Sequence, residues 1–314
     1  MSTHYQVPQD AVWFITGCSS GIGQALASYI LKNTTNRVVA TARTISSLEP
    51  LPSGLNLLKL ELDVTSQTSI QEAISNALKN FGRIDVFVNN AGYGLFGDTE
   101  SATDEMARKQ LDTNFWGAVD VTKAALPVLR EENAKNGGQK GGVVVQVSSM
   151  GGRMGFVGNA YYAASKFALE GFTECVAKEM PPDWNIHFLI LEPGGVKTNY
   201  AGSSLVHIPP HPSYTDPSFP TNQLKAYMAN PESTDDWADA HVVAEIMYST
   251  IKNGIEGVNR GKGGIPLRLP LGAESFMFQK MAHEEALREL EMLEKTSLST
   301  NPNRNLDSLE FLKK

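Results

Sequence analysis

Short apolar runs rich in β-branched residues alternate with amphipathic stretches along most of this 314-residue chain. Six such runs lie at 12–17, 37–43, 56–63, 84–91, 141–149 and 186–194. Strands that alternate with helices form a parallel sheet with helices on both faces, and right-handed crossovers wind that sheet in both directions. We therefore predict an α/β fold with one doubly wound parallel sheet.

The whole chain, 1–314, is predicted to form a single domain, because its length suits one large domain with an appendage. The core is expected at 10–200 and 232–272. The intervening segment, 199–231, is rich in Pro, Ser and Thr, and we expect an irregular lid over a substrate site. A charged amphipathic helix and tail are expected over 273–314. Its dense charges favour a packing helix over a membrane anchor, and both packing on the core and contact with a partner remain open.

Composition argues against several classes of protein. The net charge of -7 does not favour a nucleic-acid partner, and no apolar run approaches the ~20 residues that a membrane span needs. The N-terminus lacks the features of a signal peptide. The two cysteines, Cys18 and Cys175, are far apart, the six histidines are scattered, and prolines separate His207 from His211. We expect a soluble cytoplasmic protein that binds no metal.

A glycine-rich loop, "TGCSSGIG" at 16–23, lies between the first strand and the first helix. Glycine allows a sharp turn and close approach of a phosphate, while the helix N-terminus attracts a pyrophosphate. A plain strand-to-helix turn is the alternative, but the flanking strand and helix favour a dinucleotide site. Its expected contacts are Gly17, Ser19, Ser20, Gly21, Ile22 and Gly23.

The ends of the next two strands bear on which dinucleotide would bind. Ala42 stands where an acid would bind the ribose hydroxyls, and Arg43 follows it. An arginine there can pair with a 2′-phosphate, so NADP(H) is favoured over NAD(H), although a surface arginine is the alternative. Asp63 and Val64 end the third strand and are expected beside the adenine. Asp63 could instead cap the following helix.

A tyrosine and a lysine share one face of a predicted helix. In "YYAASK", Tyr162 lies four residues before Lys166, whereas Tyr161 lies four before the uncharged Ser165. A nearby ammonium favours phenolate and lowers a pKa that starts near ~10, so Tyr162 could exchange protons near neutral pH. Taken alone, such a pair is common on protein surfaces.

The chain carries further motifs in a fixed order. They are "TGCSSGIG" (16–23), "NNAG" (89–92), "NFWG" (114–117), "SS" (148–149), "YAASK" (162–166) and "PGGVKT" (193–198). In this order they resemble the short-chain dehydrogenases/reductases over roughly residues 10–200. The resemblance implies a Rossmann-like fold that closes with an edge strand, here 268–272, whose prolines also suit an edge.

The resemblance also implies roles for individual residues. Tyr162 would be the general acid/base, Lys166 would lower its pKa and hold the nicotinamide ribose, and Ser149 would bind the substrate oxygen. Ser148 would point the other way, because neighbours on a strand alternate. Asn114 would hold a water in a proton relay. Further cofactor contacts would be Asn90, Ala91, Gly92, Pro193, Gly194, Val196 and Thr198.

The function predicted from these features is hydride transfer between NADP(H) and a carbonyl or secondary alcohol of an apolar small molecule. Substrate contacts are expected at Tyr93, Met154, Phe156 and Tyr200, although the residues near 154 could simply pack a helix start. Some NADP-binding family members place a basic residue where this chain has Ser20, so the NADP prediction depends mainly on Arg43.

Several alternatives remain open at this stage. An NAD-linked alcohol dehydrogenase of the same family would use the same residues. A non-catalytic NADP-binding regulator would be expected to lose one of the Asn, Ser, Tyr and Lys residues, and an epimerase or dehydratase would more often show TGxxGxxG. Family members often form dimers or tetramers through helices that here begin near residues 103 and 160, so the resemblance implies a homodimer or homotetramer.

Overall fold

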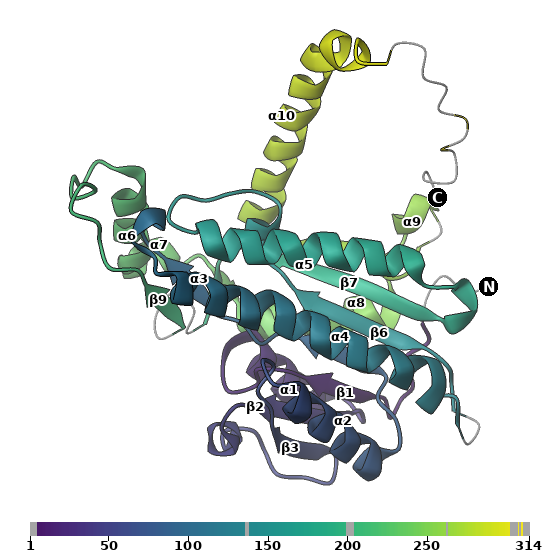
Figure 1. Cartoon of the computed structure of the whole chain (residues 1–314). Helices are drawn as coiled ribbons and strands as arrows, with labels where there is room; N and C mark the ends of the chain where they lie inside the picture. The colour runs from purple at the N-terminus through teal and green to yellow at the C-terminus, as the bar shows by residue number, and fades with distance from the viewer. Residues whose placement is uncertain are drawn as a thin grey trace.

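The computed structural model describes residues 5–135, 138–198, 204–261, 263–301, 307 and 309. A seven-stranded sheet with the order β11-β7-β6-β4-β1-β2-β3 lies at its centre (Figure 1). Its strands are β1 (Val12–Ile15), β2 (Arg37–Ala42), β3 (Leu57–Glu61), β4 (Val86–Asn89), β6 (Gly142–Val147), β7 (Ile186–Pro193) and β11 (Arg268–Leu271). All neighbouring pairs are parallel, which confirms the predicted doubly wound sheet. The proline-containing strand β11 lies at the edge, as predicted.

Helices cover both faces of the sheet. The larger ones are α1 (Gly21–Asn33), α2 (Gln67–Phe81), α4 (Gly117–Pro127), α5 (Ala160–Glu179) and α8 (Ala240–Asn253). Trp13 and Ile15 of β1 lie in a core with side chains of α1 and α8, whereas Val12 and Phe14 lie in a second core with α2 and α4. Successive residues of one strand are thus buried on opposite faces. Burial on both faces explains why the strands are continuous apolar runs.

Shorter elements connect these layers. They are η1 (Ile45–Leu48), β5 (Gly94–Phe96), η2 (Thr99–Ser101), α3 (Asp104–Leu111), η3 (Asp112–Trp116), η4 (Val128–Glu132), η6 (Met150–Gly152), η7 (Pro182–Trp184), β8 (Val196–Lys197), β9 (Leu205–His207), α6 (Pro220–Ala229), α7 (Pro231–Thr234), β10 (Ala238–Asp239) and α9 (Val258–Gly261). Two of them, η3 and η4, are π-helical turns at either end of α4.

The segment predicted to be an irregular lid contains regular structure. Residues 199–203, and Tyr200 with them, lie outside the described residues. Beyond them β9 pairs in parallel with β5, and α6 and the start of α7 follow within 204–231. The amide of Gly94 donates to the Ser204 carbonyl at 3.1 Å, and that of Ile208 donates to the Phe96 carbonyl at 2.7 Å. These bonds hold the segment against the chain that follows "NNAG".

The helix after this segment is preceded by a short strand. Ala238 and Asp239 pair with Val196 and Lys197 as β10 and β8, and α8 starts only at Ala240. The Asp239 side chain accepts from the His241 amide at 2.7 Å, so this acid is the N-cap.

The last helix, α10 (Ala273–Leu298), packs on the body only through its first turns. Ser275 Oγ donates to the Glu192 carbonyl at 2.5 Å. Farther along, α10 projects away from the sheet (Figure 1), and Leu290 and Leu293 are 64% and 54% exposed. Packing on the body is thus limited to the first turns of this helix. Within the described ranges, none of the helices is both long and apolar enough to cross a membrane.

Candidate active site

A cavity of about 1530 Å³ opens at the carboxyl ends of the central strands. It lies where β1 separates β4 from β2, which is the point at which the strand order reverses. Doubly wound sheets bind their ligands at this switch point. Ligand pockets usually measure about 300–1,000 Å³, so this cavity has room for a dinucleotide and a second molecule.

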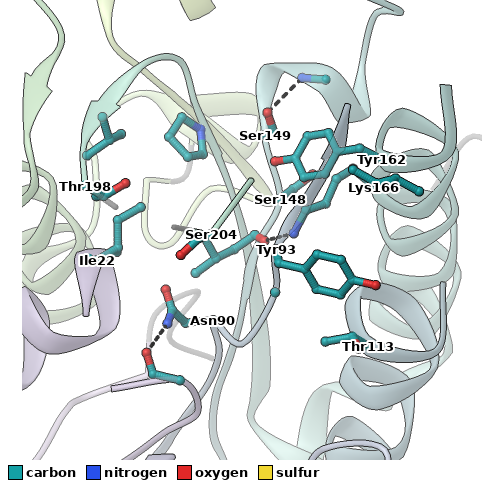
Figure 2. Close-up of a pocket in the computed structure, with 18 of the residues that line it drawn as sticks. Ile22, Asn90, Tyr93, Thr113, Ser148, Ser149, Tyr162, Lys166, Thr198 and Ser204 are labelled. Carbon is teal, nitrogen blue, oxygen red and sulfur yellow. Dashed lines mark hydrogen bonds between the residues drawn. The ribbon is translucent and has the colours of Figure 1, made fainter. Parts of the chain in front are cut away.

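The glycine loop has no space for side chains at two positions. Gly17 has φ +71°, and a Cβ there would lie 2.9 Å from the Ala91 Cα. A Cβ on Gly23 would lie 2.4 Å from Asn90 Nδ2, and this nitrogen donates to the carbonyls of Thr16 at 2.9 Å and Gly17 at 3.0 Å. Asn90 therefore fixes the loop from the neighbouring strand, as one of the dashed bonds in Figure 2 shows.

The first turn of α1 is suited to an anion. Ser20 is its N-cap but its side chain makes no capping bond, and the turn contains no acid. Its free amides and the positive end of the helix dipole face the cavity, which Ser19, Ser20, Gly21 and Ile22 line. Thr198 approaches this turn, since a Cβ on Gly21 would lie 3.3 Å from its Cγ2. These features fit the pyrophosphate of a dinucleotide.

Arg43 and Asp63 lie at neighbouring strand ends on the cavity wall. Arg43 directly follows β2 and its side chain is exposed. Asp63 Oδ1 accepts from the amide of Thr65 at 2.9 Å and from its hydroxyl at 2.7 Å. The N-cap of α2 is Ser66 rather than Asp63. Asp63 thus stabilises a turn before the helix and also lines the cavity beside Val64.

Tyr162, Lys166 and Ser149 converge on the middle of the cavity (Figure 2). The Lys166 Nζ lies 5.7 Å from the centre of the Tyr162 ring and donates to the Val147 carbonyl at 2.8 Å. Ser149 Oγ accepts from the Gly151 amide at 3.0 Å, whereas Ser148 Oγ donates to Glu170 Oε1 at 2.8 Å. The two neighbouring serines thus have separate partners.

Burial controls the charge of Lys166. Its side chain is 5% exposed, and this burial lowers the pKa of its ammonium to about 8, while the Glu170 carboxylate one turn along α5 opposes the shift. A lysine with a pKa near the pH of use can change its protonation with small changes of surroundings.

Asn114 lies behind the cavity wall, in the π-helical turn η3. Its Nδ2 donates to the Tyr93 carbonyl at 2.9 Å and to Ser165 Oγ at 3.3 Å, and its Oδ1 accepts from the Tyr93 amide at 3.1 Å. It is 1% exposed, so its side chain braces the chain after "NNAG". π-Turns are frequent at functional sites.

The "PGG" segment is covered by two residues that the sequence analysis did not identify. Glu274 Oε1 accepts from the Gly195 amide at 2.7 Å, and a Cβ on Gly195 would lie 2.5 Å from the Trp237 ring. Both side chains line the cavity next to Pro193 and Gly194. They are distant in sequence, and only the pairing of β8 with β10 and the docking of α10 bring them together.

Apolar side chains form the rest of the wall. Phe156 lines it as predicted, whereas Met154 does not, and Tyr93 lies on the wall with its ring directed toward Thr113 (Figure 2). Further apolar lining residues are Leu95, Met106, Val206, Leu224, Tyr227, Met228 and Phe278. Leu224, Tyr227 and Met228 recur at helical spacing, so a helical pattern in the segment expected to be irregular was the signal for them.

All predicted cofactor residues except Gly23 line this cavity. Gly23 packs directly behind it, as does Asn114 of the predicted catalytic set. Among the described residues, no three His, Cys, Asp or Glu side chains gather in a way that could hold a metal ion.

Comparison with known proteins gives consistent results. A family model described as short chain dehydrogenase matches residues 11–206. Oxidoreductase calM of Penicillium decumbens is 40% identical over 297 residues, or 93% of this chain and 94% of the relative. Retinol dehydrogenase 8 of Homo sapiens is 39% identical over 62% of this chain and 61% of its own length. The structure of a short-chain dehydrogenase from Streptomyces avermitilis is 29% identical, with a TM-score of 0.76 over 93% of this chain and 100% of that one.

Proposed function

Because the chain belongs to the short-chain dehydrogenase/reductase family of oxidoreductases, we propose that it transfers hydride between NADP(H) and a carbonyl or secondary alcohol of an apolar substrate. The convergence of Tyr162, Lys166 and Ser149 on one cavity at the switch point carries this proposal. A phenol, an ammonium and a hydroxyl from two adjacent elements suit the binding and protonation of one oxygen atom.

In the reductive direction, Ser149 and Tyr162 would hold the carbonyl oxygen of the substrate. Bound NADPH would supply the hydride for the carbonyl carbon. Tyr162 would give its proton to the oxygen, and the Lys166 ammonium would stabilise the phenolate that remains. Oxidation of an alcohol would run through the same residues in reverse.

The cofactor preference is proposed from Arg43. Its side chain lines the cavity at the end of β2, where an acid would select NAD(H) by binding the ribose hydroxyls, and Ala42 provides no such acid. A guanidinium can bind a 2′-phosphate through two hydrogen bonds.

The substrate class is proposed from the apolar wall of the cavity. Phe156, Leu224 and Met228 are part of that wall, together with the other apolar side chains described above. Burying such surface favours an apolar substrate by roughly 25 cal/mol per Å². The alcohol in the name of the human relative, retinol, is of this kind.

Fluorescence titration with NADPH and NADH tests the cofactor proposal. Wild type should prefer NADPH, and Arg43→Ala should lose roughly tenfold to a hundredfold in NADPH affinity while its NADH affinity stays unchanged. Arg288→Ala is the matched control, because this exposed arginine lies on the projecting part of α10. Equal binding of both cofactors by wild type would favour an NAD-linked alcohol dehydrogenase. Binding of neither would favour a non-catalytic role.

A further inference from the structure

A buried group of charged side chains lies directly behind the strand end that carries Ser149. Glu170 of α5 and Glu192 of β7 are 2% and 0% exposed. Arg268 of β11 reaches both, with its Nε 2.9 Å from Glu170 Oε2 and 3.5 Å from Glu192 Oε1. Buried charges are costly unless they are paired, so a cluster of this kind needs an explanation beyond packing.

Helix α5 bonds to two consecutive residues at the end of β6. Lys166 Nζ donates to the Val147 carbonyl at 2.8 Å, and Ser148 Oγ donates to Glu170 Oε1 at 2.8 Å. The next residue is Ser149. One turn of α5 therefore carries Lys166 of the candidate site. The same turn also binds the backbone that positions Ser149.

Glu170 is confined to this position. A Cβ on Gly152 would lie 2.5 Å from Ser148 Oγ and 2.9 Å from Glu170 Oε1, so the backbone of η6 closes over the pair. Glu170 follows Lys166 by four residues, which places the carboxylate and the ammonium on the same helical face. Arg268 binds the other oxygen of Glu170, so Oε1 remains directed at β6.

Charged and titratable side chains from several neighbouring elements surround Glu170. Lys166 and Glu174 lie on its own helix, and Arg268 lies on β11. Glu192 lies on β7, with Arg153 at 3.9 Å from its Oε1. The His283 ring of α10 contacts Arg153 at 2.7 Å.

We propose that Glu170 is a positioning residue for Ser149 and Lys166, and that this role depends on its negative charge as well as on its hydrogen bond to Ser148. The role rests on the function proposed above. Through Ser148, Glu170 fixes the end of β6 beside the reacting groups. Through its charge, it keeps the buried Lys166 protonated, as stabilisation of a phenolate at Tyr162 requires.

The titration of Lys166 measures this role and needs neither cofactor nor substrate. It can be followed by NMR in protein labelled with ¹³C at the lysine side chains, with the Lys166 resonance assigned by its loss in Lys166→Arg. The Glu170→Gln variant keeps the side-chain shape and an acceptor for Ser148. In this variant we expect the titration midpoint of Lys166 to lie roughly one pH unit below its wild-type value.

Glu174→Gln is the matched control. Glu174 lies one turn farther along the same helix and binds the same arginine, with Arg268 Nη2 at 2.8 Å. Lys166 should titrate in this variant as it does in wild type. An unchanged titration in Glu170→Gln, or an equal shift in Glu174→Gln, would overturn the proposal.

A second variant tests the same network if Glu170→Gln does not fold. The Glu192 carboxyl adds a second negative charge beside Glu170 once it ionises, so Glu192→Gln should lower the Lys166 titration by a smaller amount. No shift in that variant would also count against the proposal.

Turnover separates this proposal from the proposed function. Where wild type reduces a ketone with NADPH, the alkaline loss of activity should move to lower pH in Glu170→Gln. A Lys166 titration that shifts as expected in a protein without turnover would support the network and contradict the proposed function. If wild type turned over but the Lys166 titration did not shift in Glu170→Gln, the proposed function would be supported and the role of Glu170 would be contradicted.

Discussion

At the scale of single residues, the ionisation of Glu192 should make the stability of the fold depend on pH. Its carboxylate is fully buried, and its Oε1 lies 3.5 Å from Arg268 Nε. Burial, and then the charge of Glu170, raises the pKa of this carboxyl from 4.5 to about 7. The unfolded chain therefore loses this proton at lower pH than the folded protein does, and the folded state is penalised as pH rises.

Glu192→Gln should remove that penalty. The difference in unfolding free energy between Glu192→Gln and wild type should increase by a total on the order of 1–3 kcal/mol between pH 4.5 and about 7. Above about pH 7 it should stay constant. Urea unfolding at several pH values measures the difference.

The control for this pH dependence is Glu174→Gln. Bonds from Lys178, and then from Arg268, lower the pKa of Glu174 to about 2. This carboxylate contributes stability above pH 4.5 that is lost as pH falls toward 2, so its variant should differ from wild type in the opposite way. A Glu192→Gln difference that stays flat from pH 4.5 to 7 would show that Glu192 ionises normally in the folded protein.

At the scale of elements, α6 forms part of the apolar cavity wall that we propose faces the substrate. Leu224 and Met228 are half-buried and line the cavity from this helix. Replacing both by alanine should raise KM for an apolar ketone by roughly tenfold to a hundredfold, because each lost methylene in a hydrophobic pocket weakens binding. The affinity for NADPH should not change.

Lys225→Ala provides the comparison on the same helix. This side chain is exposed and is not part of the cavity lining, so KM should remain that of wild type. A KM unaffected in the Leu224/Met228 double variant would place the substrate elsewhere in the cavity.

Sequence patterns predicted the strands better than the segment around α6. Strands such as β4 and β6 are buried on both faces, so their apolar runs stand out. The segment 204–231 is held by the pairing of β9 with β5, which depends on residues about 110 positions away in sequence and on backbone rather than side-chain identity. Its prolines suggested an irregular lid, yet Pro220 and Pro231 occupy the first turns of α6 and α7, where proline is tolerated.

In the candidate site, too, some residues could be predicted from the sequence and others could not. Many motif residues follow strand ends, where parallel pairing brings them together, and the resemblance to a known family was enough to predict them. Glu274 and Trp237 reach the cavity only through long-range packing, and Glu170 has no role until the end of β6 is seen against α5. Such residues carry no local signal.

At the scale of the whole molecule, one sheet brings the glycine loop, the helix that carries Tyr162 and Lys166, and an apolar wall together around one large cavity. The N-terminal segment is fixed to it, since the Tyr5 hydroxyl donates to the buried Asp85 at 2.6 Å. Helix α10 links the outside to this cavity, because its first turn contributes Glu274 while its far end projects from the body (Figure 1).

In the proposed reaction, Tyr162 transfers the proton that accompanies hydride transfer. The most direct measurement is the rate of NADPH oxidation with a panel of apolar ketones, for wild type and for Tyr162→Phe, with NADPH affinity measured in parallel. We predict that the substitution lowers kcat about 10²- to 10⁴-fold while NADPH binds equally well. If Tyr162→Phe bound NADPH and turned over at the wild-type rate, Tyr162 could not be the proton donor.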